Sequence, residues 1–194
     1  MQTPIENLEN IIKRMMSPLE GTAHSYEHVE RVLKIATFLA SEEKADLELV
    51  QAGTILHDIG WTLGQPHNET GAKLSREILE EIGYPQEKGE KLFRIILHHP
   101  FEFRNRLQTL EERIVWDADK IDLLGAVGIT RAFHWGGRKP FETVMKYCFE
   151  EGLAIYGLLN TTTAKKIAEE RHRRTEAFLS ALKEELSLRD LGIS

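Results

Sequence analysis

Apolar residues recur along this chain with the period of an α-helix. From Val29 to Ala40 they stand three and four residues apart, which places them on one face of a helix. Residues 164–182 show the same spacing over a longer stretch and predict a closing helix. No run alternates apolar and polar residues, and no Asn-Gly or Asp-Gly pair marks a hairpin. The pattern predicts an all-α protein, a single helical bundle over residues 1–194.

Capping and stop signals predict more helices between these two. We expect them at residues 46–60, 72–82, 87–99 and 109–119. Asp46 is the N-cap candidate of the first, and Thr109 with Glu112 has capping-box spacing at the start of the last. Residues 60–69 are a predicted loop. Residues 100–108 and 134–140 are the least regular stretches and are predicted loops that could border a site.

Composition narrows the class of protein. With 194 residues, 41% of them hydrophobic and 29% charged, the chain has the make-up of one globular domain. The formal charge of −6 argues against a nucleic-acid polymer as partner, and no apolar run approaches a membrane span or a signal peptide. One cysteine, Cys148, rules out an internal disulfide and a cysteine-rich zinc site. We therefore expect a cytoplasmic protein.

The eight histidines are the unusual feature of this composition. Several of them gather with aspartates at predicted helix ends, in the groups His24 and His28, His57 and Asp58, His98 and His99, and Asp117, Asp119 and Asp122. His57 and Asp58 follow an apolar stretch, so their side chains should begin inside the protein and need partners. Taken one at a time, such residues are most simply explained as core histidines or capping acids. Taken together, they suggest a divalent metal, which imidazole nitrogens and carboxylate oxygens bind.

Three motifs in this order resemble the HD superfamily of metal-dependent phosphohydrolases. They are H-x-x-R-V from His28, H-D-I-G from His57 and D-A-D-K-I-D from Asp117. The later segments DADKIDLLGAVGITRAF and TTTAKKIAEERHRRTEAFL are similar to a subgroup of small bacterial HD hydrolases, so the resemblance extends over nearly the whole chain. The ordered set of motifs on an all-α chain is a far more specific signal than an isolated His-Asp pair.

The resemblance implies four metal ligands, namely His28, His57, Asp58 and Asp119. They would hold one divalent ion, which could be Mn, Co, Ni, Mg, Fe or Zn, and would leave positions open for water and a phosphate oxygen. Asp58 would thereby be catalytic as well as a ligand. The implied reaction is hydrolysis of a phosphoester or phosphoanhydride bond by a metal-activated water. The acidic charge suits a small phosphorylated metabolite, most plausibly a nucleotide.

Several other residues receive roles by type and position. Arg31 and Lys120 are candidates to hold substrate phosphate, with a solvated helix face as the alternative. Glu69 is a candidate general acid or base. His24 and Asp122 could orient metal ligands, although Asp122 could equally be a surface acid.

Two features depart from the simplest pattern of the family. Many relatives place a lysine after His-Asp-Ile-Gly, where this chain has Trp61, which could stack on a nucleobase or close the core. Relatives with two metals recruit extra histidines, and this chain offers His67, His98 and His99 in that interval. Because His67 lies in a predicted loop close to His57, we expect a single ion, with His98 and His99 facing substrate or the core.

Two alternatives from other classes remain. One is a di-iron oxygenase that uses the extra histidines, and the other is a non-catalytic nucleotide or metal sensor that has kept the pocket. The sequence does not identify the metal or the substrate. It also leaves open whether the protein forms a homodimer.

Overall fold

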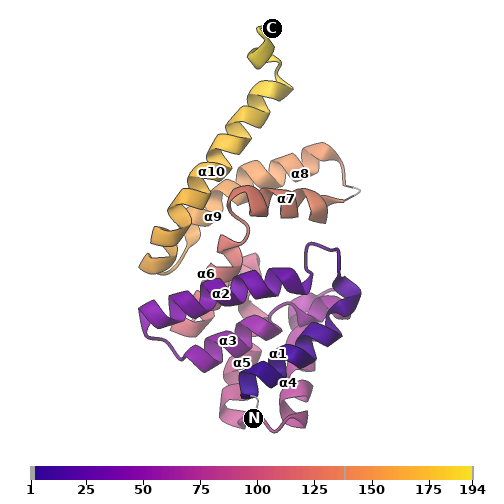
Figure 1. The fold of residues 1–194 in the computed structure, drawn as a ribbon, viewed down its shortest axis with the longest axis vertical. Helices are drawn as coiled ribbons and strands as arrows, with labels where there is room; N and C mark the ends of the chain where they lie inside the picture. The colour runs from indigo at the N-terminus through magenta and orange to yellow at the C-terminus, as the bar shows by residue number, and fades with distance from the viewer. Residues whose placement is uncertain (1–2, 138, 194) are drawn as a thin grey trace. The chain divides into compact units, whose positions relative to one another are not determined.

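The structure is a computed structural model that describes residues 3–137 and 139–193. Every regular element in these ranges is a helix, which confirms the predicted all-α class (Figure 1). The α-helices are α1 (Pro4–Met15), α2 (Tyr26–Glu43), α3 (Leu47–Leu56), α4 (His67–Glu81), α5 (Gln86–His98), α6 (Leu110–Ile121), α7 (Gly125–Gly136), α8 (Phe141–Tyr147), α9 (Leu153–Leu158) and α10 (Thr162–Leu186). Shorter helical turns are η1 (Ser17–Leu19), η2 (Ile59–Thr62), η3 (Phe101–Arg106), η4 (Cys148–Gly152) and η5 (Arg189–Leu191).

The predicted helices are all present, and their caps follow the expected chemistry. The Asp46 carboxylate accepts a hydrogen bond from Leu49 N, and Thr109 Oγ1 accepts one from Glu112 N. The predicted loops are wrong in part. The segment 60–69 contains η2 and the first turn of α4, and the segment 100–108 contains η3. The segment 134–140 begins with the last three residues of α7, and its residue 138 lies outside the described residues.

Contacts along the chain divide it into two compact units, residues 1–119 and residues 120–194. The single domain expected from the sequence stays a prediction.

The first unit is built on close packing between α2 and α3, between α4 and α5, and between α3 and α5. Gly53 on α3 permits the last of these contacts, because a Cβ there would lie 2.9 Å from Ile95 Cγ2 on α5. The side chain of Trp116, on α6, is completely buried. The apolar faces of several helices therefore share one core, and that core carries the predicted site residues at helix ends.

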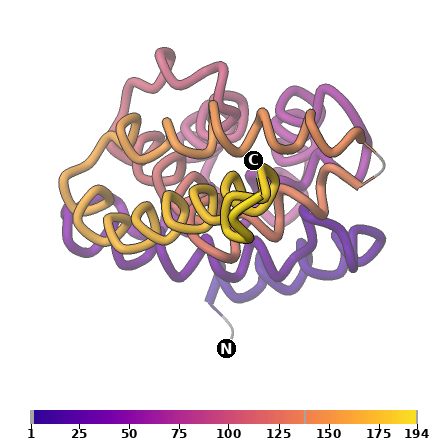
Figure 2. Tube along the Cα trace, turned by 90° about the horizontal axis from the view of Figure 1, so that it is seen from above, coloured from indigo at the N-terminus to yellow at the C-terminus, as the bar shows by residue number. Residues whose placement is uncertain are grey.

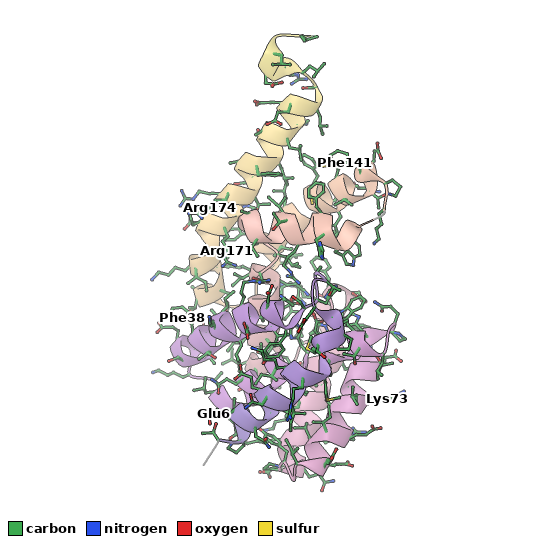
Figure 3. The ribbon with its side chains drawn as sticks, turned by 45° about the vertical axis from the view of Figure 1, so that its right-hand side comes forward. Glu6, Phe38, Lys73, Phe141, Arg171 and Arg174 are labelled. Carbon is green, nitrogen blue, oxygen red and sulfur yellow. The ribbon has the colours of Figure 1, made fainter. Side chains whose placement is uncertain are left out.

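In the second unit, α10 runs beside α7 (Figure 1, Figure 2). Its core includes Ala132, Val144, Cys148 and Leu179. The labelled side chain of Arg171 on α10 (Figure 3) donates a hydrogen bond to the carbonyl of Ile121 at 3.1 Å.

Among the residues that the structure describes, no helix combines the length and the apolar character that a membrane crossing requires.

Candidate metal centre

The centre of the site is the junction between α3 and η2. The apolar helix α3 ends at Leu56, so His57 and Asp58 leave it inside the core, where His57 has no exposed surface and Asp58 is 4% exposed. His57 Nδ1 donates a hydrogen bond to the carbonyl oxygen of Thr54 at 2.7 Å. This bond fixes the ring and leaves Nε2 as the atom that faces the other site residues.

Two further helices bring donor atoms close to His57. His28 lies in the first turn of α2 and is buried on the same face as Val29 and Val32. Its Nε2 lies 3.3 Å from His57 Nε2 and 3.3 Å from Oδ1 of Asp119, which stands near the end of α6. His28, His57 and Asp119 thus form a first group of donor atoms, all within 4.8 Å of one another.

A second group of donors lies next to the first. It consists of Asp58, His67 and His99, again within 4.8 Å of one another. His67 Nε2 and His99 Nε2 are 3.1 Å apart, and His99 Nε2 lies 3.5 Å from Asp58 Oδ1. His99 Nδ1 donates to the carbonyl oxygen of Ile96 at 2.7 Å, as His57 does to Thr54.

Asp58, a member of the second group, also approaches the first group through its other carboxylate oxygen. Oδ1 faces His99, whereas Oδ2 lies 3.5 Å from His57 Nε2 and 3.7 Å from His28 Nε2. His24 Nδ1 also contacts Oδ2, at 3.1 Å. One carboxylate therefore connects the two donor groups.

Glycine at two positions allows the second group to form. A Cβ on Gly60 would overlap the carbonyl oxygen of His67 and lie 2.7 Å from Gly71 N, so the start of α4 can pack against η2 only when this residue is glycine. A Cβ on Gly71 would in turn lie 3.0 Å from Gly60 N. This close approach places His67, the first residue of α4, beside His99.

Electrostatics keep the site rich in lone pairs. Burial lowers the pKa of His57 to about 4, against the opposing effect of Asp58 and Asp119, so the ring is neutral at neutral pH. Burial, together with the nearby His99 ring, lowers the pKa of His67 to about 4 as well. Burial alone would raise the pKa of Asp58, but His57 and the hydrogen bonds from His24 and His99 hold that pKa well below its ordinary value.

The protonation pattern tests whether the site fits a metal. A neutral imidazole that donates through Nδ1 presents a lone pair at Nε2. In His57 this lone pair faces Oδ2 of the Asp58 carboxylate. Such electron-rich atoms repel one another unless a cation lies between them. Ligand atoms about 2.1 Å from a shared ion lie about 3.0 Å apart at right angles and about 3.4 Å apart at the tetrahedral angle. The observed separations are close to these values, so the residues fit a divalent ion.

Trp61, which directly follows the motif His-Asp-Ile-Gly, lies between two of the histidines. Its ring stacks on His24, with centroids 4.1 Å apart and planes at 21°, and on His67, with centroids 4.4 Å apart and planes at 15°. Both faces of the indole are therefore covered, which is incompatible with the suggestion that it stacks on a nucleobase.

The structure brings together most of the predicted site residues but not all of them. His24, His28, His57, Asp58, His99 and Asp119 converge as described. His98 is not in either donor group; it contacts Phe103, and burial lowers its pKa, with Glu112 acting in the opposite direction. Glu69 is exposed in the first turn of α4, and Arg31 lies half-buried on α2.

Lys120 and Asp122 belong to the second unit. Both side chains are buried, so neither takes the solvent-exposed position that was the alternative for it. Lys120 is 5% exposed, so it does not lie on a solvated helix face. Asp122 has no exposed surface and its Oδ2 lies 3.1 Å from Arg131 Nη1, so it is not a surface acid.

His67 is the site residue that sequence reasoning undervalued. Its assignment to a loop was wrong, because α4 begins at this residue. The signal that could have revealed it is the pair Gly60 and Gly71, whose missing side chains indicate a close approach of two segments.

Known proteins resemble this chain in sequence and in fold. The family model of the HD domain matches residues 25–124. The uncharacterized protein YpgQ of Bacillus subtilis is 29% identical over 180 residues, which are 86% of each chain. Its crystal structure in complex with ADP matches with a TM-score of 0.76 at 26% identity and covers 93% of this chain and 97% of that one.

Two further solved structures are similar over nearly the full length. A protein of Lactobacillus plantarum matches with a TM-score of 0.83 at 25% identity and covers 97% of this chain and 100% of its own. An HD-superfamily hydrolase of Bacillus thuringiensis matches with a TM-score of 0.75 at 28% identity, covering 94% of this chain and 96% of its own.

Proposed function

Because the chain belongs to the HD domain family, whose members include hydrolases, we propose that it is a divalent-metal-dependent phosphohydrolase of a small phosphorylated metabolite. The observation that carries the proposal is the convergence of His28, His57, Asp58 and Asp119, whose buried donor atoms face one another at 3.3 to 3.7 Å. Such a set fits an ion that keeps coordination positions for ligands from solvent or substrate.

The side chains of the proposed site have separate tasks. His57 is fixed by Thr54 and presents Nε2, and His28 and Asp119 complete the set from α2 and α6. A divalent cation bound there lowers the pKa of a coordinated water and polarises a phosphoryl oxygen. His24 holds Oδ2 of Asp58 and so keeps that carboxylate oriented. Arg31, one turn beyond His28 on α2, is our candidate for contact with a substrate phosphate.

We further propose that the substrate is a nucleotide. The support comes from YpgQ, which was crystallised with ADP and is similar to this chain over 93% of its length. The formal charge of −6 suits such a small ligand better than a polymer.

The test is a hydrolysis screen of nucleotides and other phosphoesters, repeated with each divalent metal and paired with elemental analysis. We expect metal-dependent turnover in the wild-type protein and loss of both bound metal and turnover in Asp58→Ala. Glu69→Gln serves as a matched carboxylate control outside the donor groups and should keep its metal. A protein that turns over substrate fully after metal removal would refute the proposal.

The second donor group favours one other candidate function. A centre with two metal ions would also suit the di-iron oxygenase. Asp58, His67 and His99 could hold a second ion, with Asp58 shared. Two irons per chain and consumption of oxygen would support the oxygenase. One or two redox-inactive divalent ions with phosphate release would support the phosphohydrolase instead.

A further inference from the structure

Trp61 connects two histidines that serve different donor groups. The indole belongs to η2, the short turn that follows Asp58, while His24 precedes α2 and His67 begins α4. The three rings form one continuous stack, His24 on one face of the indole and His67 on the other, with interplanar angles of 21° and 15°. Aromatic rings stacked at such separations and angles attract one another beyond the area they bury.

The edges of the two imidazoles carry the polar contacts of the stack. His24 Nδ1 lies 3.1 Å from Oδ2 of Asp58, and His67 Nε2 lies 3.1 Å from His99 Nε2. Rotation of either ring about its Cβ–Cγ bond would therefore withdraw one nitrogen from the donor groups. The flat indole opposes this rotation on both sides, because a tilted ring would lose its stacking contact.

Stacking is also the main interaction that the indole offers. Trp61 Nε1 is buried and has no hydrogen-bond partner among the described residues. Apart from its contacts with Trp61 and His99, the His67 ring has among the described residues a long contact of 3.4 Å from Nδ1 to Gln65 Oε1. His57 and His99, by contrast, each donate Nδ1 to a backbone carbonyl at 2.7 Å and need no such support.

We propose that Trp61 is a positioning residue of the metal centre, whose ring sets the orientation of His24 and His67 through its two faces. This inference rests on the proposed function only in its effect on metal affinity; the stack itself exists without metal. Substitution of residues that orient metal ligands lowers metal affinity by about 10–100-fold. We expect the loss to fall on the group of Asp58, His67 and His99, to which the stack contributes a ligand.

The experiment compares Trp61→Phe, which keeps a flat ring, with Trp61→Leu, which keeps apolar bulk without one. Trp135→Leu is the matched control, because Trp135 contacts Tyr147 and lies in the second unit, at 41% exposure. The first measurement is the NMR spectrum of histidine-labelled, metal-free protein, with His24 and His67 assigned from His24→Asn and His67→Asn. Trp61→Leu should move the ring signals of both histidines, and Trp135→Leu should leave them in place.

The second measurement is a Mn²⁺ titration of the same variants. Trp61→Leu should weaken Mn²⁺ binding by about tenfold or more, with Trp61→Phe and Trp135→Leu close to wild type. Unchanged histidine signals in Trp61→Leu would overturn the stack, and moved signals with unchanged Mn²⁺ affinity would overturn its positioning role. Equal loss in Trp61→Phe and Trp61→Leu would also overturn it, since a flat ring would then not matter. A wild-type protein that binds no divalent metal would refute the proposed function, while the metal-free spectra would still decide the stack.

Discussion

Gly60→Ala is the sharpest single perturbation of the site, because it adds one methyl group where two backbones meet. The new Cβ would overlap the carbonyl oxygen of His67 and lie 2.7 Å from Gly71 N, both of them backbone atoms of α4. Neither atom can rotate away as a side chain would. The first turn of α4 must therefore shift away from η2, and His67 must move with it.

The expected loss in the free energy of unfolding can be taken from known cases of overpacking. Forcing one extra methyl group into a packed contact destabilises a protein by about 1–3 kcal/mol. For a chain of this length each kcal/mol lowers the melting temperature by about 2–4 °C. The displaced His67 should also weaken Mn²⁺ binding to the second donor group, where its Nε2 lies 3.1 Å from His99 Nε2.

Gly89→Ala provides the matched control. Gly89 lies within α5, and a Cβ there would meet nothing within 4 Å. Alanine is a better helix former than glycine by about 0.5–1 kcal/mol, so the same chemical change should stabilise this position. Urea unfolding and Mn²⁺ titration of both variants would then show effects of opposite sign on stability and an effect on metal affinity only for Gly60→Ala. A Gly60→Ala protein with the unfolding midpoint and Mn²⁺ affinity of wild type would refute the reasoning.

The remaining predictions concern a ligand, an ion pair and a thiol. Asp119→Asn, which removes a charged donor 3.3 Å from His28 Nε2, should lose bound metal and turnover in elemental analysis and activity assays, while melting close to wild type when metal is absent. Glu48→Gln tests a pH effect: hydrogen bonds from Lys88 and Tyr84 lower the pKa of Glu48 below 4.5, so its stabilisation is complete above pH 4.5 and is lost as the pH falls through the lowered pKa. The difference in melting temperature between wild type and this variant should therefore be greatest near neutral pH and shrink in acid; a difference that grew in acid would contradict it. Because burial raises the pKa of Cys148, a thiol reagent should label it slowly in the native protein and rapidly in urea; rapid native labelling would show that the thiol is accessible.

The sequence predicted several of the helices that local chemistry marks, but not all of them. Asp46 and Thr109 cap α3 and α6 as their residue types suggest. The first helix, α1, was not predicted, although Thr3 and Glu6 form a capping box at its start. The helices α7, α8 and α9 were also not anticipated, because glycines and the short turn η4 interrupt their apolar periodicity.

The site residues also differ in how far the sequence predicts them, because some lie in local motifs and others depend on long-range packing. The motifs around His28, His57 and Asp119 identified residues that do converge. The second donor group depends instead on the packing of α4 against η2, a contact between segments about ten residues apart that periodicity does not describe. His99 was expected to face substrate or the core; it is buried, and its Nε2 lies 3.5 Å from Asp58 Oδ1. Which of two adjacent histidines faces inward depends on where α5 ends.

The charges of the two donor groups limit how they can be filled. Only Asp58 and Asp119 among these donors carry negative charge, so one divalent cation already neutralises them. A second cation would share the Asp58 carboxylate with the first and would leave an excess of positive charge in a buried site, which is costly unless an anion compensates it. Binding of a second ion should therefore be the weaker of the two events and should strengthen when a phosphate group enters the site. A structure with two donor groups joined by one carboxylate is thus compatible both with the single tightly held ion expected from the sequence and with a second ion that arrives together with an anionic substrate.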